Sequence, residues 1–209
     1  MAAEALEDLV AAYRILAEHG VIDAYGHVSV RSPRDPGRYY LARAIAPERV
    51  QLEDLIEYDL DSKALDANGR DSVTERYIHG EIYRARPEVM AVVHSHSASV
   101  IPFGVTRTQL RPIYHMGSFL WSGAPVFDIR KIREDNDLLI RDRTLGQALS
   151  RTLSSCSCVL MRGHGMTVVG DSVPEAVFRA IYTEMNARLQ LQATRLDGPI
   201  EFLSDEEGR

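Results

Sequence analysis

The sequence has 209 residues, of which 45% are hydrophobic and 26% charged, and its formal net charge is -6. This length suits one domain with its own core, so we expect a single domain over residues 1–209, and the composition argues against disorder. The acidic balance argues against a nucleic-acid groove, which normally shows a basic excess. Two cysteines, Cys156 and Cys158, are too few for a disulfide framework.

Two further features predict a cytoplasmic protein without membrane spans. The first 20 residues carry acids where a signal peptide would carry lysines. The longest stretch free of charged side chains, residues 89–106, contains two histidines, three serines and a proline, which a membrane span would not tolerate.

The first half of the chain predicts one helix followed by short strands. Leu6, Leu9, Val10, Tyr13 and Leu16 lie on one face of an amphipathic helix that Gly20 ends. Strands are expected over residues 26–31, 39–45, 58–61 and 63–65, with a loop or short helix over 47–55.

The second half predicts three helices interleaved with strands. Residues 72–75 (SVTE) fit a capping box that opens a helix through Ala85, and residues 89–94 form a buried strand. Residues 101–130 are rich in proline and glycine, with short strands around Ile113 and Val126. A helix over 136–153 precedes a strand over 156–162 that continues through 166–169. A second capping box, 172–175, opens the last helix.

This order of elements predicts an α/β fold. Several strands follow one another through short turns, which favours a mixed or largely antiparallel sheet covered by helices over a parallel doubly wound sheet. The sequence contains no glycine-rich phosphate loop.

Three histidines at strand ends predict a metal site. His94 and His96 are two apart, so in a strand they point to one face, where a divalent ion would bind both. The alternative is a polar pair exposed to water. His164 lies between two glycines after an apolar strand, and alone it is equally consistent with a turn histidine. Together the three form the His₃ set of an open catalytic metal site.

Other candidates have structural alternatives. Glu75 either caps its helix or stands near the metal and moves protons. Tyr114 and His115 are candidate proton donors or a half-buried interface pair. His79 lies in a helix and is expected at the surface.

The order and surroundings of these residues resemble the class II aldolase/adducin family. GHVSVR (26–31) resembles the family's Gly-Asn-x-Ser segment. Residues 74–97, TERYIHGEIYRARPEVMAVVHSHS, resemble the segment from an acid/base glutamate to the His-x-His pair, and LMRGHGMTVVG (160–170) resembles the third-ligand segment.

The resemblance implies a three-layer α/β/α fold around a mostly antiparallel sheet. It implies a divalent metal, Zn²⁺ or Mn²⁺, on His94, His96 and His164, with Glu75 beside it as acid/base. It also implies a homotetramer with active sites between subunits, and the aromatic segment 111–121 supports such an interface.

Departures from the sugar-phosphate members indicate a different substrate. The asparagine position is His27, with Ser29 after it, and the Thr-Gly pair falls on Glu48 and Arg49. The two serines that hold phosphate fall on Val73 and Thr74, and the mobile tyrosine falls on His115. We therefore expect a carboxylate substrate held by Arg49, His27, Ser29 and Thr74; alternatively, Arg49 only pairs with Glu48 or Asp54 on the surface.

Residues 94–105, 110–116 and 178–190 resemble most the decarboxylase branch, which acts on substrates such as hydroxypyridine dicarboxylate or dihydroxyphthalate. The first hypothesis is thus a metal-dependent carbon–carbon lyase that decarboxylates an ortho-hydroxy aromatic or heteroaromatic acid, with Glu75, His115 or Tyr114 moving the proton. The second is a class II aldolase for a non-phosphorylated hydroxy or oxo acid. The third is a non-catalytic, adducin-like interaction module.

Overall fold

A seven-stranded mixed sheet forms the middle of the computed structural model, which describes residues 2–208. The strands lie in the order β3-β2-β1-β4-β7-β6-β5, and every neighbouring pair is antiparallel except β5 and β6. Their bounds are β1 His27–Arg31, β2 Arg38–Ala42, β3 Leu55–Asp59, β4 Ala91–Ser95, β5 Val126–Phe127, β6 Cys158–Met161 and β7 Gly165–Gly170.

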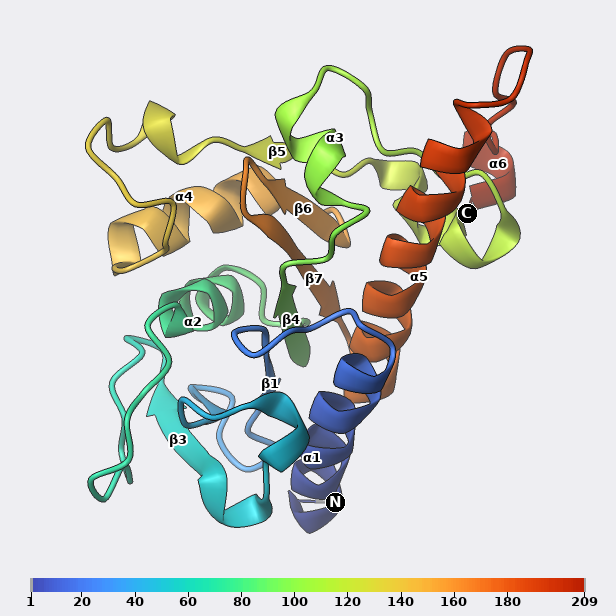
Figure 1. Ribbon diagram of the computed structural model, residues 1–209. Helices are drawn as coiled ribbons and strands as arrows, with labels where there is room; N and C mark the ends of the chain where they lie inside the picture. Colours follow the sequence, from blue (N-terminus) through green and yellow to red (C-terminus); the bar gives the residue numbers. More distant parts are fainter. Residues whose placement is uncertain (1, 209) are drawn as a thin grey trace.

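Helices cover both faces of the sheet and make three layers, as expected (Figure 1). On one face α1 packs against α5, and on the other face α2 packs against α4. The α-helices are α1 Ala2–Glu18, α2 Arg76–Ala85, α3 Ile101–Val105, α4 Arg143–Leu153, α5 Val173–Ala193 and α6 Asp205–Gly208. Short 3₁₀ turns are η1 Pro47–Arg49, η2 Leu52–Asp54, η3 His115–Ser122 and η4 Ile129–Lys131.

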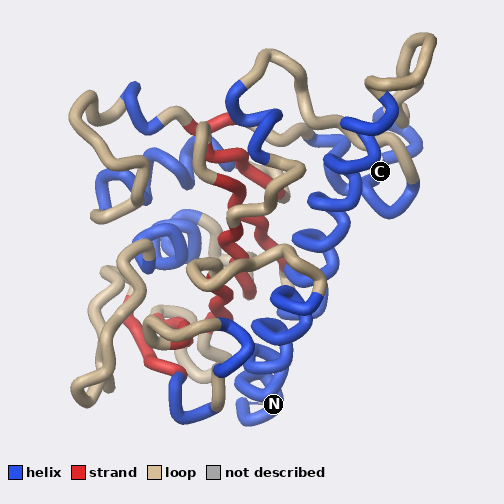
Figure 2. Tube along the Cα trace, viewed as in Figure 1, coloured by secondary structure: helices blue, strands red, loops and turns tan. Residues whose placement is uncertain are grey.

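The alternation of side chains along each strand divides the core into two clusters. In β4, Ala91 and Val93 pack with the α1/α5 layer, whereas Val92 packs with the α2/α4 layer. His94 is next on the α2/α4 side, so the strand carries a polar side chain to the edge of an apolar core. Figure 2 shows the strands running through the middle of the molecule between the helices.

Several predicted element bounds are wrong. Residues 63–65 make only an isolated bridge between Tyr58 and Ala64, and no strand forms around Ile113. Helix α4, the third of the predicted helices, starts at Arg143 rather than at residue 136. The chain does not run straight from β6 into β7 but reverses between them, since the two strands are antiparallel.

The reversal between β6 and β7 depends on its glycines. Gly163 has a φ of +66°, which glycine adopts without strain. A Cβ added to Gly165 would lie 2.0 Å from the Ser95 carbonyl oxygen, so only glycine lets β7 lie this close to the end of β4. No helix within residues 2–208 has the length and apolar character needed to span a bilayer.

Candidate metal centre

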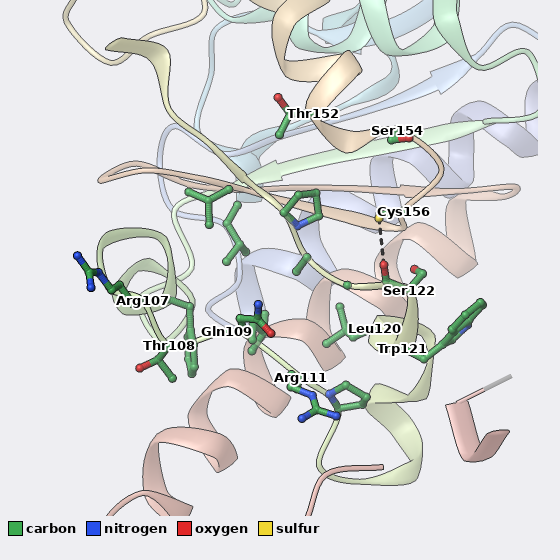
Figure 3. A pocket seen from close by; sticks show the side chains of 18 of the residues that line it. Arg107, Thr108, Gln109, Arg111, Leu120, Trp121, Ser122, Thr152, Ser154 and Cys156 are labelled. Carbon is green, nitrogen blue, oxygen red and sulfur yellow. Dashed lines mark hydrogen bonds between the residues drawn. The ribbon is translucent and has the colours of Figure 1, made fainter. Parts of the chain in front are cut away.

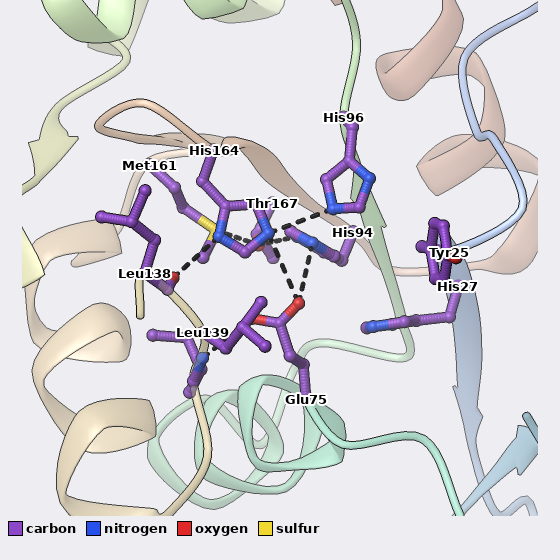
Figure 4. A network of polar contacts seen from close by, with 12 residues as sticks. Tyr25, His27, Glu75, His94, His96, Leu138, Leu139, Met161, His164 and Thr167 are labelled. Atoms are coloured by element: carbon purple, nitrogen blue, oxygen red, sulfur yellow. Dashed lines mark hydrogen bonds and ion pairs between the residues drawn. The ribbon is translucent and has the colours of Figure 1, made fainter. Parts of the chain in front are cut away.

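Glu75, His94, His96 and His164 converge at one end of the central strands (Figure 4). One ligand atom from each lies within 4.8 Å of the others, and all but the half-buried His96 are buried. Glu75 directly precedes α2, His94 lies in β4, His96 follows the strand, and His164 lies in the turn between β6 and β7. The strand-face prediction therefore holds for His94 alone, and the turn after β4 brings His96 to the same point.

Oxygen acceptors fix the orientation of all three imidazoles. The Nδ1 atoms of His94 and His164 lie 3.0 and 2.9 Å from the carbonyl oxygens of Met166 and Leu138. The Nδ1 of His96 lies 3.1 Å from a carboxylate oxygen of Asp23. Because these oxygens only accept, each Nδ1 carries the proton and each Nε2 keeps a free lone pair. This is the second-shell arrangement typical of metal-binding histidines.

The free Nε2 atoms face one another and the Glu75 carboxylate. The Nε2 atoms of His96 and His164 are 3.1 Å apart, and Oε2 of Glu75 lies 3.5 and 3.4 Å from Nε2 of His94 and His164. Within the described chain, Nε2 of His94 is fully buried and has no hydrogen-bond partner. Lone pairs this close repel one another unless a cation lies between them, so the cluster fits a metal ion that prefers nitrogen and carboxylate ligands.

Glu75 is turned toward this cluster rather than toward its own helix. It stands at the N-cap position of α2 but makes no side-chain cap bond, and the Ser72 hydroxyl instead bonds that of Tyr58. The predicted capping box is therefore wrong. Oε1 of Glu75 accepts a hydrogen bond from the Ile140 amide at 2.8 Å. Burial alone would raise the pKa of Glu75, but its histidine neighbours and the Ile140 amide outweigh burial and lower this pKa to about 2.

The pKa values of His94 and His164 shift in opposite directions, although burial opposes protonation of both rings. It lowers the pKa of His94 well below the ordinary value, so this ring is neutral. It also opposes protonation of His164, but the Glu75 carboxylate outweighs burial there and raises the pKa of His164. The Glu75 oxygen lies almost equally far from both rings, so the difference follows from the more complete burial of His94, whose side chain is 0% exposed against 6% for His164.

A cavity of about 680 Å³ opens beside the cluster and is lined by Glu75 and His96 of the cluster. His27 and Thr74, two of the predicted substrate contacts, also line it. The remaining walls are mostly apolar or aromatic and come from four loops and α1: Tyr13, Ala24, Tyr25, Gly26, Arg43, Ala44, Ile45, Ala46, Ser72, Val73 and Leu139.

The other two predicted substrate contacts are not in this cavity. Arg49 is exposed and does not line it. Arg43 lines it instead, with its Nε held by a carboxylate oxygen of Asp54 at 2.6 Å. Ser29 is completely buried beneath the cavity, where its hydroxyl bonds His79 and Tyr83.

His79 was expected at the surface, and this prediction is wrong. The side chain is completely buried between α2 and β1, with its Nε2 atom 2.7 Å from Nδ1 of His27 and its Nδ1 atom 2.6 Å from Oγ of Ser29. Burial lowers the pKa of His79 to about 3. The sequence did carry a signal, because His79 lies three and four positions before Ile82 and Tyr83, the spacing of side chains on one helix face.

Comparison with known proteins gives a family match over a range that contains these motifs. Residues 7–191 match the model of the Class II Aldolase and Adducin N-terminal domain. The chain belongs to this family. Decarboxylase tropJ of Talaromyces stipitatus is 43% identical, with 93% of this chain and 82% of that protein covered. A 3,4-dihydroxyphthalate decarboxylase of Arthrobacter keyseri is 30% identical, with 98% and 85% covered.

Solved structures of the family share the fold. The L-fuculose 1-phosphate aldolase of Glaciozyma antarctica superposes with a TM-score of 0.82 at 23% identity, covering 99% of this chain and 79% of that one. The chain is thus a decarboxylase-like enzyme on the class II aldolase fold, with a Glu/His cluster that could hold a metal ion.

Two residues that the family resemblance named stand apart from the cluster. Tyr114 and His115 lie at the start of η3 and do not line the cavity in this chain. His115 is exposed, whereas the Tyr114 hydroxyl is buried without a hydrogen-bond partner among the described residues. Burial raises the pKa of Tyr114 to about 12.

A second cavity of about 520 Å³ lies near η3 and β5 (Figure 3). Arg107, Arg111, Trp121 and Cys156 are among its lining residues, and it contains none of the four cluster residues. The Cys156 thiol donates to the Ser122 carbonyl oxygen at 3.3 Å, and both cysteines are free. This cavity is separate from the Glu/His cluster.

Proposed function

We propose that this protein is a metal-dependent decarboxylase of an ortho-hydroxy aromatic or heteroaromatic carboxylate. The observation that carries the proposal is the set of three inward-facing imidazole Nε2 atoms and one carboxylate, which opens into a cavity with apolar walls. Relatives at 43% and 30% identity are named decarboxylases, which supports loss of CO₂ over aldol cleavage.

A zinc or manganese ion on His94, His96 and His164 would supply a Lewis acid for the negative oxygens of the substrate. The histidines beside Glu75 and the Ile140 amide lower the pKa of this carboxyl group to about 2, so it is ionised at neutral pH and holds no proton to donate. The proton that replaces the lost carboxylate must therefore come from another group or from water.

The cavity walls suit a flat ring with a second carboxylate. Ala24, Ile45, Ala46 and Val73 offer small or apolar surfaces that leave room for an aromatic ring. Arg43 replaces Arg49 as the anchor for a carboxylate, because neither of its terminal nitrogens has a partner among residues 2–208. A guanidinium group matches a carboxylate in a bidentate way.

We also propose a homotetramer with active sites shared between subunits. His115 and Tyr114 are the candidate proton donors, and neither lines the cavity beside the cluster of its own chain. A neighbouring subunit would have to bring them to the cavity. Large apolar side chains exposed nearby, Trp121 at 38% and Phe178 at 37%, support an interface on this side.

The test is product analysis with the zinc- or manganese-loaded protein. We expect CO₂ and the decarboxylated phenol from a panel of dihydroxyphthalates, hydroxybenzoates and hydroxypyridine dicarboxylates, and no CO₂ from the His164→Ala variant. An aldehyde formed from a hydroxy acid without CO₂ would favour the aldolase hypothesis. If the metal-loaded protein converts neither the aromatic acids of this panel nor a hydroxy acid, the result would favour the non-catalytic interaction module.

A further inference from the structure

A chain of four buried polar side chains leads from the core to the cavity. The Tyr83 hydroxyl lies 2.7 Å from Oγ of Ser29, which lies 2.6 Å from Nδ1 of His79. Nε2 of His79 lies 2.7 Å from Nδ1 of His27. All four residues are at most 3% exposed. The other ring nitrogen of His27, Nε2, is buried and has no partner among the described residues.

His27 ends this chain beside the metal centre. His27 on β1 lies opposite His94 on β4 in the antiparallel pairing of these strands, and the centroids of the two rings are 5.0 Å apart. Figure 4 shows the ring reaching toward the cluster, and His27 lines the cavity. It is not one of the four residues whose ligand atoms lie within 4.8 Å of one another. Buried polar atoms are normally hydrogen-bonded, so the unpartnered Nε2 of His27 at the cavity wall indicates that an atom of a bound molecule forms its hydrogen bond.

The hydroxyl groups determine which ring nitrogens carry protons. Among residues 2–208, Oγ of Ser29 is the only acceptor at the Tyr83 hydroxyl, because the neighbouring Val92 backbone amide can only donate, so the tyrosine proton goes to Ser29. The Ser29 proton then goes to Nδ1 of His79, and His79 keeps its own proton on Nε2. That proton is donated to Nδ1 of His27, which leaves the His27 proton on Nε2. The opposite direction would leave the buried tyrosine proton without an acceptor.

We propose that His27 donates a hydrogen bond from Nε2 to an oxygen of the anionic substrate, and that His79 and Ser29 are positioning residues that keep the proton on that nitrogen. The identity of the substrate rests on the proposed function. The hydrogen-bond chain gives each of the two rings one acceptor nitrogen and one N–H, so each ring is neutral and carries one proton. A neutral donor selects an acceptor oxygen beside the cluster without adding a charge that would repel a cation.

The first experiment reads the tautomers without any substrate. In zinc-loaded protein labelled with ¹⁵N-histidine, long-range ¹H–¹⁵N spectra distinguish protonated from unprotonated ring nitrogens. We expect His27 and His79 both to carry the proton on Nε2. Ser29→Ala removes the link and should give a mixture of tautomers at His27. Tyr83→Phe is the matched control: the Ser29 proton still needs His79 as its acceptor, so the tautomers should not change.

The second experiment measures binding of 2-hydroxybenzoate to the zinc-loaded protein by calorimetry. Asparagine and leucine have nearly the same shape, but only asparagine donates a hydrogen bond. His27→Leu should weaken binding by about tenfold or more, as for a lost hydrogen bond to a charged group, whereas His27→Asn should keep most of the affinity. Zinc content should stay at the wild-type level in both variants.

Three results would overturn the inference: an unprotonated Nε2 on His27 in the wild type, equal affinities of the two His27 variants, or loss of zinc from His27→Leu, which would make His27 a ligand. The tautomer measurement separates this inference from the proposed function. The predicted tautomers without CO₂ release from any hydroxy acid would contradict only the proposed function. CO₂ release with an unprotonated His27 Nε2 would contradict only the role of His27.

Discussion

The His164 imidazole shows how single contacts prepare a ligand. Its Nδ1 is held by the Leu138 carbonyl oxygen at 2.9 Å, which leaves Nε2 free for an ion. We predict that His164→Ala and His94→Ala reduce the metal content from about one ion per chain to near zero, because two imidazoles and a carboxylate hold zinc much less tightly than the full set. Elemental analysis after gel filtration gives the content.

The matched control for these variants is His19→Ala, since His19 is an exposed histidine outside the cluster. It should keep the full metal content. Circular dichroism should show the same secondary structure in all variants. Full occupancy in both cluster variants would refute the assignment.

Arg43 and Arg49 make a second matched pair at the residue scale. Arg43 lines the cavity, whereas Arg49 is exposed outside it. If Arg43 binds a substrate carboxylate, Arg43→Lys should lower kcat/KM by about tenfold or more, because lysine cannot make the bidentate contact. Arg49→Lys should keep wild-type kinetics. Steady-state assays of both variants, on the substrate that the panel identifies, test this prediction. A loss of kcat/KM in Arg49→Lys but not in Arg43→Lys would show that Arg49 binds the carboxylate, as expected from the sequence.

The packing of α2 against β1 buries His79 and makes stability depend on pH. The unfolded chain binds a proton at this histidine below its ordinary pKa of 6.5, but the folded protein does so only near its lowered pKa of about 3. Stability is therefore lost as the pH falls from 6.5 toward 3. We predict that His79→Gln reduces the slope of unfolding free energy against pH between pH 6 and pH 5 by about 1 kcal/mol per pH unit.

Urea unfolding of both metal-free proteins at several pH values gives this slope. The exposed His19→Gln variant serves as the control and should keep the wild-type slope. Equal slopes for the wild type and His79→Gln would show that His79 does not stay neutral in the fold.

The elements that local patterns determine were the ones that the sequence predicted well. The apolar face of α1 and the Ser172 cap of α5 are both present, because each depends on residues close together in the chain. The SVTE segment has the same local pattern as a capping box. There, however, the Tyr58 hydroxyl on β3 bonds Ser72, and Glu75 faces His94 on β4 and His164 in the turn between β6 and β7. Contacts between distant segments thus overrode the local preference.

The same distinction applies to the candidate site. The three histidines and Glu75 could be proposed from motifs, and the structure brings them together. Which arginine reaches the cavity could not be predicted, since Arg43 and Arg49 are six positions apart on one connection and only its path places one of them inside. The burial of Ser29 and His79 was also missed, because it depends on how α2 lies on β1.

At the scale of the whole molecule, shared active sites make a prediction about mixtures. His164→Ala lacks a cluster ligand, and His115→Ala lacks the proposed proton donor at η3. If a site combines the cluster of one subunit with His115 of its neighbour, equal mixing with subunit exchange should restore about a quarter of wild-type activity, because random assembly reunites the intact halves.

Sedimentation of the wild type at micromolar concentration should accompany this assay and is expected to give a tetramer. Each variant incubated alone is the control and should stay nearly inactive. A mixture as inactive as its two components, or a fully active monomer, would show that each chain builds its own site.

Different segments of the chain supply the histidines and the cavity walls, so mutations can alter one without altering the other. The histidines depend on the ends of β4 and on the tight reversal before β7, whereas Ala44, Ile45, Ala46 and Val73 come from connecting loops that tolerate substitution. Laboratory evolution confined to these four positions can therefore change the substrate specificity and leave the Glu/His cluster unchanged.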